Sequence, residues 1–135
     1  MATYFISDLH LEKIESSIST IFSEFLERLD GDDQLYILGD LFESWIGDDN
    51  VSELSAFVVN QLKLLSNKGI QVSIMHGNRD FLIGNDFCDA ASIQLINDPC
   101  IIDINDEKAM LTHGDQFCTD DHEYQAFRSV VRNPI

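Results

Sequence analysis

The sequence is poor in basic residues, and this limits the partners that it can bind. Of its 135 residues only 8 are Lys or Arg, whereas 24 are Asp or Glu, so the formal net charge is −16 at pH 7. Binding to duplex nucleic acid or to anionic lipid relies on clustered Lys and Arg side chains. We therefore expect no nucleic-acid partner and no strong electrostatic attraction to a lipid surface.

Metal-binding cysteine pairs, a basic leader and long apolar runs are also missing. The three cysteines have no CxxC or similar spacing, which favours reduced thiols in a cytosolic protein. The segment 1–10 has no Lys or Arg and already includes Asp8, so it does not resemble a secretory signal. The uncharged apolar runs are far shorter than a membrane span. We expect a cytoplasmic chain that forms a single domain over residues 1–135.

The apolar pattern predicts strands that alternate with amphipathic helices. Short apolar runs typical of buried strands lie at 3–7, 34–38, 71–75, 93–95, 100–104 and 108–111. Helical spacing predicts a helix with the apolar stripe Ile14, Ile18, Ile21, Phe22, Phe25 and Leu29. Further helices are expected after the N-cap residue Ser52, with a stop at 67–69, and over 87–91 and 121–132. This alternation indicates an α/β domain whose first sheet is largely parallel.

Four of the predicted strands lead at once to polar side chains of the kind that bind metals. The first leads to Asp8 and His10, the second to Asp40, the third to Asn78 and the last to His113. In an open α/β sheet, residues just beyond the carboxyl ends of the strands converge on one edge. We therefore expect these five side chains in a common pocket.

The donor types indicate a pair of divalent metal ions. Carboxylate, imidazole and amide donors without thiolate suit Mn²⁺, Fe or Zn²⁺. A bridging Asp40 would hold two ions about 3.5–4 Å apart, as in two-metal hydrolases, so that the nucleophile is a metal-bound hydroxide and no side chain. Gly39 and Gly77 would let the backbone turn where a side chain would crowd the ions. Alone, Asp-x-His, Gly-Asp and His-Gly-Asp are more often ordinary turns. Gly-Asn-Arg-Asp is more specific, because Asn and Arg at a strand exit have no obvious packing role, and the prediction depends on all four motifs together.

The same motifs resemble those of the calcineurin-like metallophosphoesterases. They are Asp-Leu-His at 8–10, Gly-Asp at 39–40, Gly-Asn-Arg-Asp at 77–80 and His-Gly-Asp at 113–115. The longer runs at 5–11, 39–49, 76–82 and 111–128 resemble one branch of that family, the UDP-2,3-diacylglucosamine pyrophosphatases of lipid A synthesis. The resemblance covers essentially the whole chain and implies a β-sandwich flanked by helices.

This resemblance implies a reaction and a setting for it. The expected reaction is hydrolysis of the pyrophosphate bond of UDP-2,3-diacylglucosamine to UMP and 2,3-diacylglucosamine 1-phosphate, with two Mn²⁺ or other divalent ions as cofactors. The full-length enzyme would be a monomer. Because its substrate is a lipid, it would make transient contact with the cytoplasmic face of the inner membrane as a peripheral protein.

The resemblance also implies a metal-ligand set. Asp8 and His10 would bind one ion, Asn78 and His113 would bind the other, and Asp40 would lie between them.

Three residues would contact the substrate. Arg79 would donate charged hydrogen bonds to the pyrophosphate, and Asn78 and Asp121 would also lie in the substrate-binding region. Simpler interpretations are an ion pair of Arg79 with Asp80 or another of the many carboxylates, and a helix N-terminal carboxylate at Asp121.

Two features of the family have no counterpart in the sequence. The four histidines are His10, His76, His113 and His122, and none lies in the Gly-His-x-His motif that completes the family's metal shell. Residues 121–135 match only the start of the family's helical lid, and the second sheet would be incomplete, with exposed apolar surface. We therefore interpret the chain as the N-terminal part of such an enzyme, with impaired turnover. A metallophosphoesterase for another phosphodiester and an inactive metal-binding fragment remain alternatives.

Overall fold

The computed structural model describes residues 2–45, 47, 52–77, 83–104 and 106–114. The predicted helix over 121–132, and with it the start of a lid, lies outside these residues. Strands and helices alternate along the chain in the order β1 (Thr3–Ile6), α1 (Ser17–Glu27), β2 (Gln34–Ile37), α2 (Glu53–Asn67), β3 (Gln71–Ile74), α3 (Asn85–Ala91), β4 (Gln94–Leu95), β5 (Cys100–Ile104) and β6 (Glu107–Leu111).

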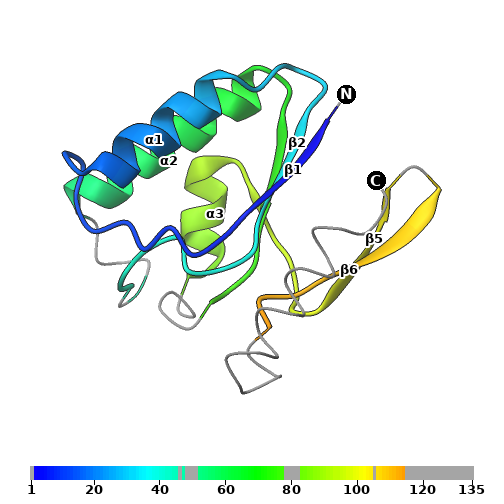
Figure 1. Cartoon of the computed structure of the whole chain (residues 1–135). Helices are drawn as coiled ribbons and strands as arrows, with labels where there is room; N and C mark the ends of the chain where they lie inside the picture. The colour runs from blue at the N-terminus through cyan, green and yellow to red at the C-terminus, as the bar shows by residue number, and fades with distance from the viewer. Residues whose placement is uncertain (1, 46, 48–51, 78–82, 105, 115–135) are drawn as a thin grey trace.

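The first four strands form one sheet in the order β1-β2-β3-β4, and every neighbouring pair is parallel. This confirms the expected parallel sheet of an α/β fold. When each strand pairs with the next and all crossovers have the same hand, the connecting helices lie on the same face. Figure 1 shows this arrangement, with α1, α2 and α3 on one side of the sheet and the β5–β6 hairpin on the other.

Alternating side chains give the sheet two buried faces. Toward the helices point Leu35, Ile37, Val72 and Ile74, which join the larger core cluster. Toward the hairpin lies a smaller cluster of three buried residues, Leu38, Met75 and Leu111, with Phe5, Tyr36 and Ile102 packed against it. Burial of one such side chain contributes about 1.5–3 kcal/mol, so both layers stabilise the sheet.

Helix α2 begins where the sequence predicts. The Ser52 hydroxyl accepts a hydrogen bond from the Ser55 backbone N–H, and the Ser55 hydroxyl oxygen accepts one from the Ser52 N–H. This capping box satisfies N–H groups that have no partner within the helix. The helix ends at Asn67 and is followed by Gly69 at φ +88°, a left-handed conformation that favours glycine.

The predicted stripe of α1 is partly wrong. The helix begins at Ser17 after the N-cap residue Ser16, so Ile14 and Leu29 lie outside it, and its buried residues are Ser19, Phe22 and Leu26. Ile18 and Ile21 are instead 46% and 62% exposed. The buried face includes Ser19, whose hydroxyl donates to the Lys13 carbonyl at 2.7 Å. A small polar residue at that position hides the true face from a search for apolar spacing.

Strands β5 and β6 form a separate antiparallel sheet of two strands. Its outer face carries the cross-strand pair Ile101 and Met110, which are 60% and 39% exposed. Two apolar side chains on this face of the hairpin are therefore exposed to solvent. Among the described helices, none combines the length and the apolar character that crossing a membrane requires.

Candidate metal centre

The loops that follow β1 and β2 run side by side from the edge of the sheet. Ile6 and Ile37 are paired in register at the ends of the two strands. Beyond them the Asp8 N–H donates to the Gly39 carbonyl at 3.1 Å, and the His10 N–H donates to the Asp40 carbonyl at 3.0 Å. The register of the strands thus continues into the loops and places these polar residues next to one another.

Three residues of these loops have a left-handed backbone. The φ angles of Asp8, His10 and Asp40 are +58°, +50° and +54°. Residues other than glycine seldom adopt this conformation, which costs of order 1–3 kcal/mol for each residue and is found mostly at functional sites. The backbone therefore turns at these positions in a way that local preference does not favour.

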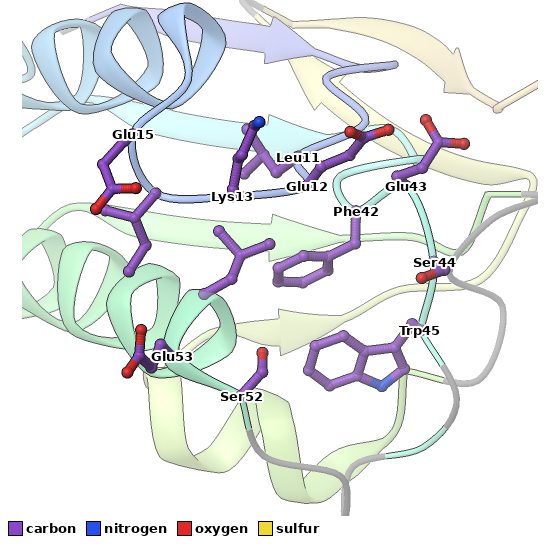
Figure 2. Close-up of a pocket in the computed structure, with 12 residues that line it drawn as sticks. Leu11, Glu12, Lys13, Glu15, Phe42, Glu43, Ser44, Trp45, Ser52 and Glu53 are labelled. Carbon is purple, nitrogen blue, oxygen red and sulfur yellow. The ribbon is translucent and has the colours of Figure 1, made fainter.

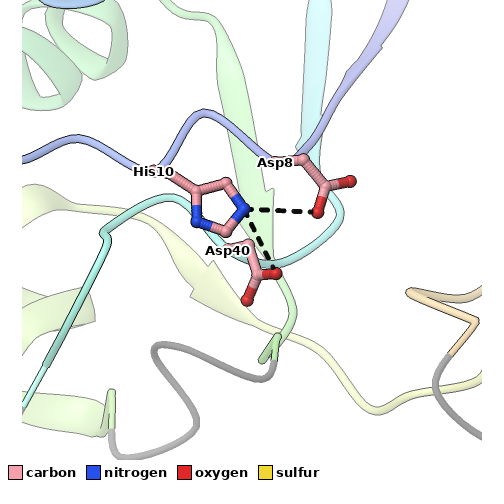
Figure 3. Close-up of side chains that lie close together, drawn as sticks. All are labelled: Asp8, His10 and Asp40. Atoms are coloured by element: carbon pink, nitrogen blue, oxygen red, sulfur yellow. Dashed lines mark ion pairs between the residues drawn. The ribbon is translucent and has the colours of Figure 1, made fainter.

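The side chains of Asp8, His10 and Asp40 converge, as Figure 3 shows. His10 Nε2 lies 3.7 Å from Asp8 Oδ1 and 3.6 Å from Asp40 Oδ2. One ligand atom from each of the three lies within 4.8 Å of the others. Two carboxylates and one imidazole at this spacing form a group that can hold a divalent metal ion.

His113 reaches the same carboxylate from the other sheet. It follows the end of β6, and its Nε2 lies 3.4 Å from Asp40 Oδ2, with the two side chains only 5% and 7% exposed. Its Nδ1 lies 2.8 Å from the Leu38 carbonyl oxygen. A carbonyl only accepts, so the contact assigns the proton to Nδ1, and in a neutral ring Nε2 would then present its lone pair toward Asp40. His113 is therefore oriented to offer Nε2 to a metal beside Asp40.

Two glycines allow the ligands to come this close. A Cβ on Gly77 would collide with the backbone nitrogen and the carboxylate of Asp40. A Cβ on Gly39 would lie 2.6 Å from His113 Nδ1, and the backbone there has φ +96°. The sequence predicted that a side chain at either glycine would crowd the metal ions. The structure shows which groups it would meet, and these are the ligand candidates Asp40 and His113 themselves.

Asp98 fixes the segment that carries His113. Its Oδ1 accepts a hydrogen bond of 2.7 Å from the Thr112 hydroxyl, and its Oδ2 accepts one of 3.4 Å from the His113 N–H. Thr112 is fully buried, and its hydroxyl oxygen accepts in turn from the Gly114 N–H at 3.0 Å. A buried hydroxyl needs such partners, so this network holds the turn after β6 in one conformation.

A cavity of about 740 Å³ is lined by residues 11–15, 42–45 and 52–54, which include the segments that follow His10 and Asp40 in the chain (Figure 2). Phe42 and Trp45 are stacked in its wall, with ring centroids 4.6 Å apart. Its lining also includes acidic side chains, among them Glu43, whose Oε2 lies 3.4 Å from His10 Nδ1. The cavity and the metal centre therefore share a residue.

Four of the five predicted ligands are placed by the structure. Asp8, His10, Asp40 and His113 come together as expected, whereas Asn78 lies outside the described residues. The predicted substrate contacts Arg79 and Asp121 lie outside them too. The sequence prediction missed Glu43 and Asp98, whose side chains approach the two histidines. Glu43 lies only three residues after Asp40, but no spacing rule links Asp98 to His113.

The donor set fits a divalent metal ion better than an ordinary network of ion pairs. Both histidines direct Nε2 toward Asp40 and turn Nδ1 to another oxygen, from Glu43 at His10 and from Leu38 at His113. Histidines that bind metals commonly have this arrangement, because the second nitrogen fixes the ring.

Comparison with known proteins identifies similar sequences in several bacteria. No protein-family model matches it. It is 49% identical, over 99% of its length, to a UDP-2,3-diacylglucosamine hydrolase of Stenotrophomonas maltophilia, of which the match covers 54%. Proteins of the same name from Marinobacter nauticus and Xanthomonas axonopodis are 49% and 46% identical, with 55% of each covered. The chain is therefore homologous to these hydrolases, as predicted, and spans about half their length.

A solved structure is also similar to the chain. A protein of unknown function from Aquifex aeolicus matches 96% of this chain and 72% of its own, with a TM-score of 0.59 and 19% identity. At that identity the similarity concerns the fold alone.

Proposed function

We propose that this chain carries the metal-binding part of an enzyme that hydrolyses UDP-2,3-diacylglucosamine to UMP and 2,3-diacylglucosamine 1-phosphate. The main support is the convergence of Asp8, His10 and His113 on the carboxylate of Asp40. The names of relatives that are 46–49% identical support the substrate. Since the chain spans about half of their length, the activity is proposed for the whole protein.

In this proposal Asp40 would contribute to holding both of two Mn²⁺ ions. Asp8 and His10 would hold one ion, and His113 with Asn78 would hold the other. Such ions supply positive charge that polarises a phosphoryl oxygen and lowers the pKa of a water molecule. The carboxylates of Asp8 and Asp40 would leave a pair of divalent ions with net positive charge, which attracts an anionic pyrophosphate.

The protein's own contribution is orientation. Asp40 is 5% exposed, and its Oδ2 lies 3.6 Å from His10 Nε2 and 3.4 Å from His113 Nε2, so burial and the two histidines restrict the orientation of its carboxylate. Leu38 holds the His113 ring through Nδ1, which keeps Nε2 directed into the site. A site that is oriented before binding loses less free energy to reorganisation when charge develops on the phosphoryl group.

Arg79 would donate hydrogen bonds to the pyrophosphate, and Asn78 and Asp121 would contact the substrate. The parallel sheet and the hairpin are compatible with the metallophosphoesterase β-sandwich, whose second sheet would here be incomplete. We further propose that the whole enzyme is a cytoplasmic monomer that contacts the inner membrane peripherally.

The test is Mn²⁺ binding and Mn²⁺-dependent release of UMP, measured on this chain and on one extended to the length of its relatives. We expect the extended chain to turn over and Asp40→Asn to reduce its rate at least about 100-fold, in the range lost when a central electrostatic group is removed. Asp89→Asn, on the exposed side of α3, is the charge-matched control and should keep full activity.

Three outcomes would change this proposal. If the extended chain cleaves only a simple phosphodiester, the lipid substrate is wrong. If neither chain binds Mn²⁺ or another divalent ion, the metal centre is wrong. If both bind metal and hydrolyse nothing, the chain is a metal-binding module without activity.

A further inference from the structure

The two nitrogens of the His10 ring face different carboxylates. Nε2 faces Asp8 and Asp40, and Nδ1 lies 3.4 Å from Glu43 Oε2. We propose that Glu43 is a positioning residue that accepts the Nδ1 proton of His10 and thereby holds Nε2 toward the metal. This inference rests on the proposed metal-binding function of His10.

The backbone holds Glu43 in register with His10. The Glu43 N–H donates to the Leu11 carbonyl at 3.0 Å, and the Leu11 N–H donates to the Leu41 carbonyl at 2.9 Å. Leu11 and Phe42 also form an isolated parallel bridge, and their side chains are 2% and 1% exposed. Each partner is therefore next in sequence to an anchored, buried residue, and their proximity follows from the fold.

The proposed contact would change the chemistry of the imidazole. A metal-bound neutral histidine has one N–H, and a carboxylate that accepts it fixes the ring and makes the other nitrogen a stronger donor. At His113 the corresponding acceptor is the neutral Leu38 carbonyl. The two histidines would therefore differ in strength, with the charged acceptor at His10.

The separation of 3.4 Å is longer than the 2.7–3.2 Å of an ordinary hydrogen bond. Both side chains are 34% exposed, which leaves them room to rotate. Metal binding at Nε2 would favour the rotamers in which Nδ1–H meets the carboxylate. The contact should therefore be strongest in the metal-loaded protein, and the experiment must examine that state.

Glu43 also lines the cavity, so loss of its charge could act on the metal from a distance. Glu12 provides the matched control, because it lines the same cavity and carries the same charge. No ion pair of Glu12 with His10 is found among the described residues. A through-space charge effect would weaken metal binding in both variants, whereas positioning would weaken it only in the Glu43 variant.

The first measurement is Mn²⁺ affinity of the 135-residue chain, from the electron paramagnetic resonance signal of free Mn²⁺. Loss of an outer acceptor typically weakens metal binding 10–100-fold. We expect about a 10-fold loss for Glu43→Ala, a smaller one for Glu43→Gln, which keeps an oxygen acceptor, and less than about a 3-fold change for Glu12→Ala. Thermal melting of the metal-free variants checks that they fold.

The second measurement uses nitrogen-15 NMR of the histidines in the Zn²⁺-loaded chain. We expect a protected Nδ1–H resonance of His10 that is lost in Glu43→Ala and retained in Glu43→Gln. The Nδ1–H resonance of His113 should be the same in all variants.

Equal loss of Mn²⁺ affinity in the Glu43 and Glu12 variants would overturn the proposal, and so would a His10 resonance that is unchanged in Glu43→Ala. Loss of one bound metal equivalent in Glu43→Gln would make Glu43 a ligand instead. Failure of the parent chain to bind any metal would refute the proposed function itself.

Discussion

The two sheets contribute unequally to the metal centre. The parallel sheet supplies Asp8, His10 and Asp40, and its helix-side face belongs to the larger core cluster beneath α1, α2 and α3. Among the described residues, the hairpin side supplies one ligand candidate, His113. The hairpin rests on a cluster of three buried residues, while Ile101 on its outer face is 60% exposed. Most of the ligand candidates therefore belong to the well-buried layer, and one depends on the layer with less burial.

This difference implies that metal affinity and global stability can change independently. Regions with few buried apolar contacts open locally at a lower free energy than the whole domain. If the hairpin separates from the sheet, His113 leaves the site while the carboxylates of the parallel sheet stay in place. Substitutions in the two layers test this.

The largest effect is expected from a matched pair of truncations. Leu62, on α2, and Leu111, on β6, are both fully buried. Leu62→Ala should reduce the free energy of unfolding by about 2–5 kcal/mol, and Leu111→Ala by about 2 kcal/mol, at the low end of that range. Under native conditions, however, Leu111→Ala should weaken Mn²⁺ binding more than Leu62→Ala does. Urea denaturation and Mn²⁺ titration provide the two measurements, and the reverse order of metal affinities would contradict the comparison.

The next effect concerns the crowded glycine between the layers. Gly77→Ala should destabilise the protein by about 1–3 kcal/mol, as overpacking does, and should strongly weaken Mn²⁺ binding because the new Cβ displaces Asp40. Gly69→Ala is the control for a strained glycine substitution away from the site, since Gly69 follows α2 and has φ +88°, a conformation that alanine adopts only with strain. The control should lower the melting temperature and keep the affinity. A Gly77→Ala variant with unchanged affinity would show that Asp40 does not need this close approach.

A smaller loss of Mn²⁺ affinity is expected from a substitution in the segment that carries His113. Asp98→Ala leaves the buried Thr112 hydroxyl without its acceptor, at a cost of about 1–3 kcal/mol. The turn after β6 would then loosen, and Mn²⁺ affinity should fall by the same factor as in His113→Ala or less. Asp98→Ala could act through the hydroxyl that it leaves without an acceptor or through the loss of the network that holds the turn. Thr112→Val separates these two causes, because it breaks the same network but also removes that hydroxyl. If Asp98→Ala left both stability and affinity unchanged, the network would be incidental.

The smallest effect is a dependence of stability on pH. The Asp33 carboxylate accepts hydrogen bonds from the Asp30 N–H at 2.8 Å and the Ala2 N–H at 3.0 Å, which lower its pKa below the ordinary value of 3.8, the Asp30 bond most. A group with a lowered folded-state pKa stabilises the fold above its unfolded-state pKa, and this contribution is lost as the pH falls through the folded value.

Asp33→Asn should therefore melt at a lower temperature than the parent at neutral pH, and the difference should shrink as the pH falls below 3.8. Asp32→Asn removes an adjacent exposed charge and serves as the control. Because Asp33 joins the start of β1 to the turn before β2, the effect should leave the hairpin untouched. A difference between parent and variant that is constant with pH would exclude the proposed linkage.

How far the sequence predicted the fold depended on how local each signal is. The N-cap at Ser52 and the short apolar runs that became β2 and β3 are short-range patterns, and the structure agrees with them. The predicted apolar stripe of α1 was wrong at Ile18 and Ile21, which are exposed. Which face of a helix is buried depends on its rotation about its own axis, and the packing partners set this rotation.

For the candidate site, too, the success of the prediction depended on how local each signal is. Each ligand candidate that the structure describes follows a strand end, so the sheet topology brought those ligands together. The roles of Asp98 and Glu43 depend on contacts between separate segments: Asp98 meets a residue 15 positions away, and Glu43 meets His10 across two loops in register. Such contacts leave no periodic pattern in the sequence.

The left-handed backbone at Asp8, His10 and Asp40 restricts which residues a mutational library can accept there. Val, Ile and Thr should be the most strongly depleted residues among folded variants at these positions, since branching at Cβ makes this conformation most costly. Gly and Asn should be recovered as folded proteins with altered metal binding, because they adopt it with little penalty. Alanine substitutions would combine loss of a ligand with backbone strain. Asn at Asp8 and Asp40 therefore separates the chemical role of the carboxylate from the conformational demand of its position.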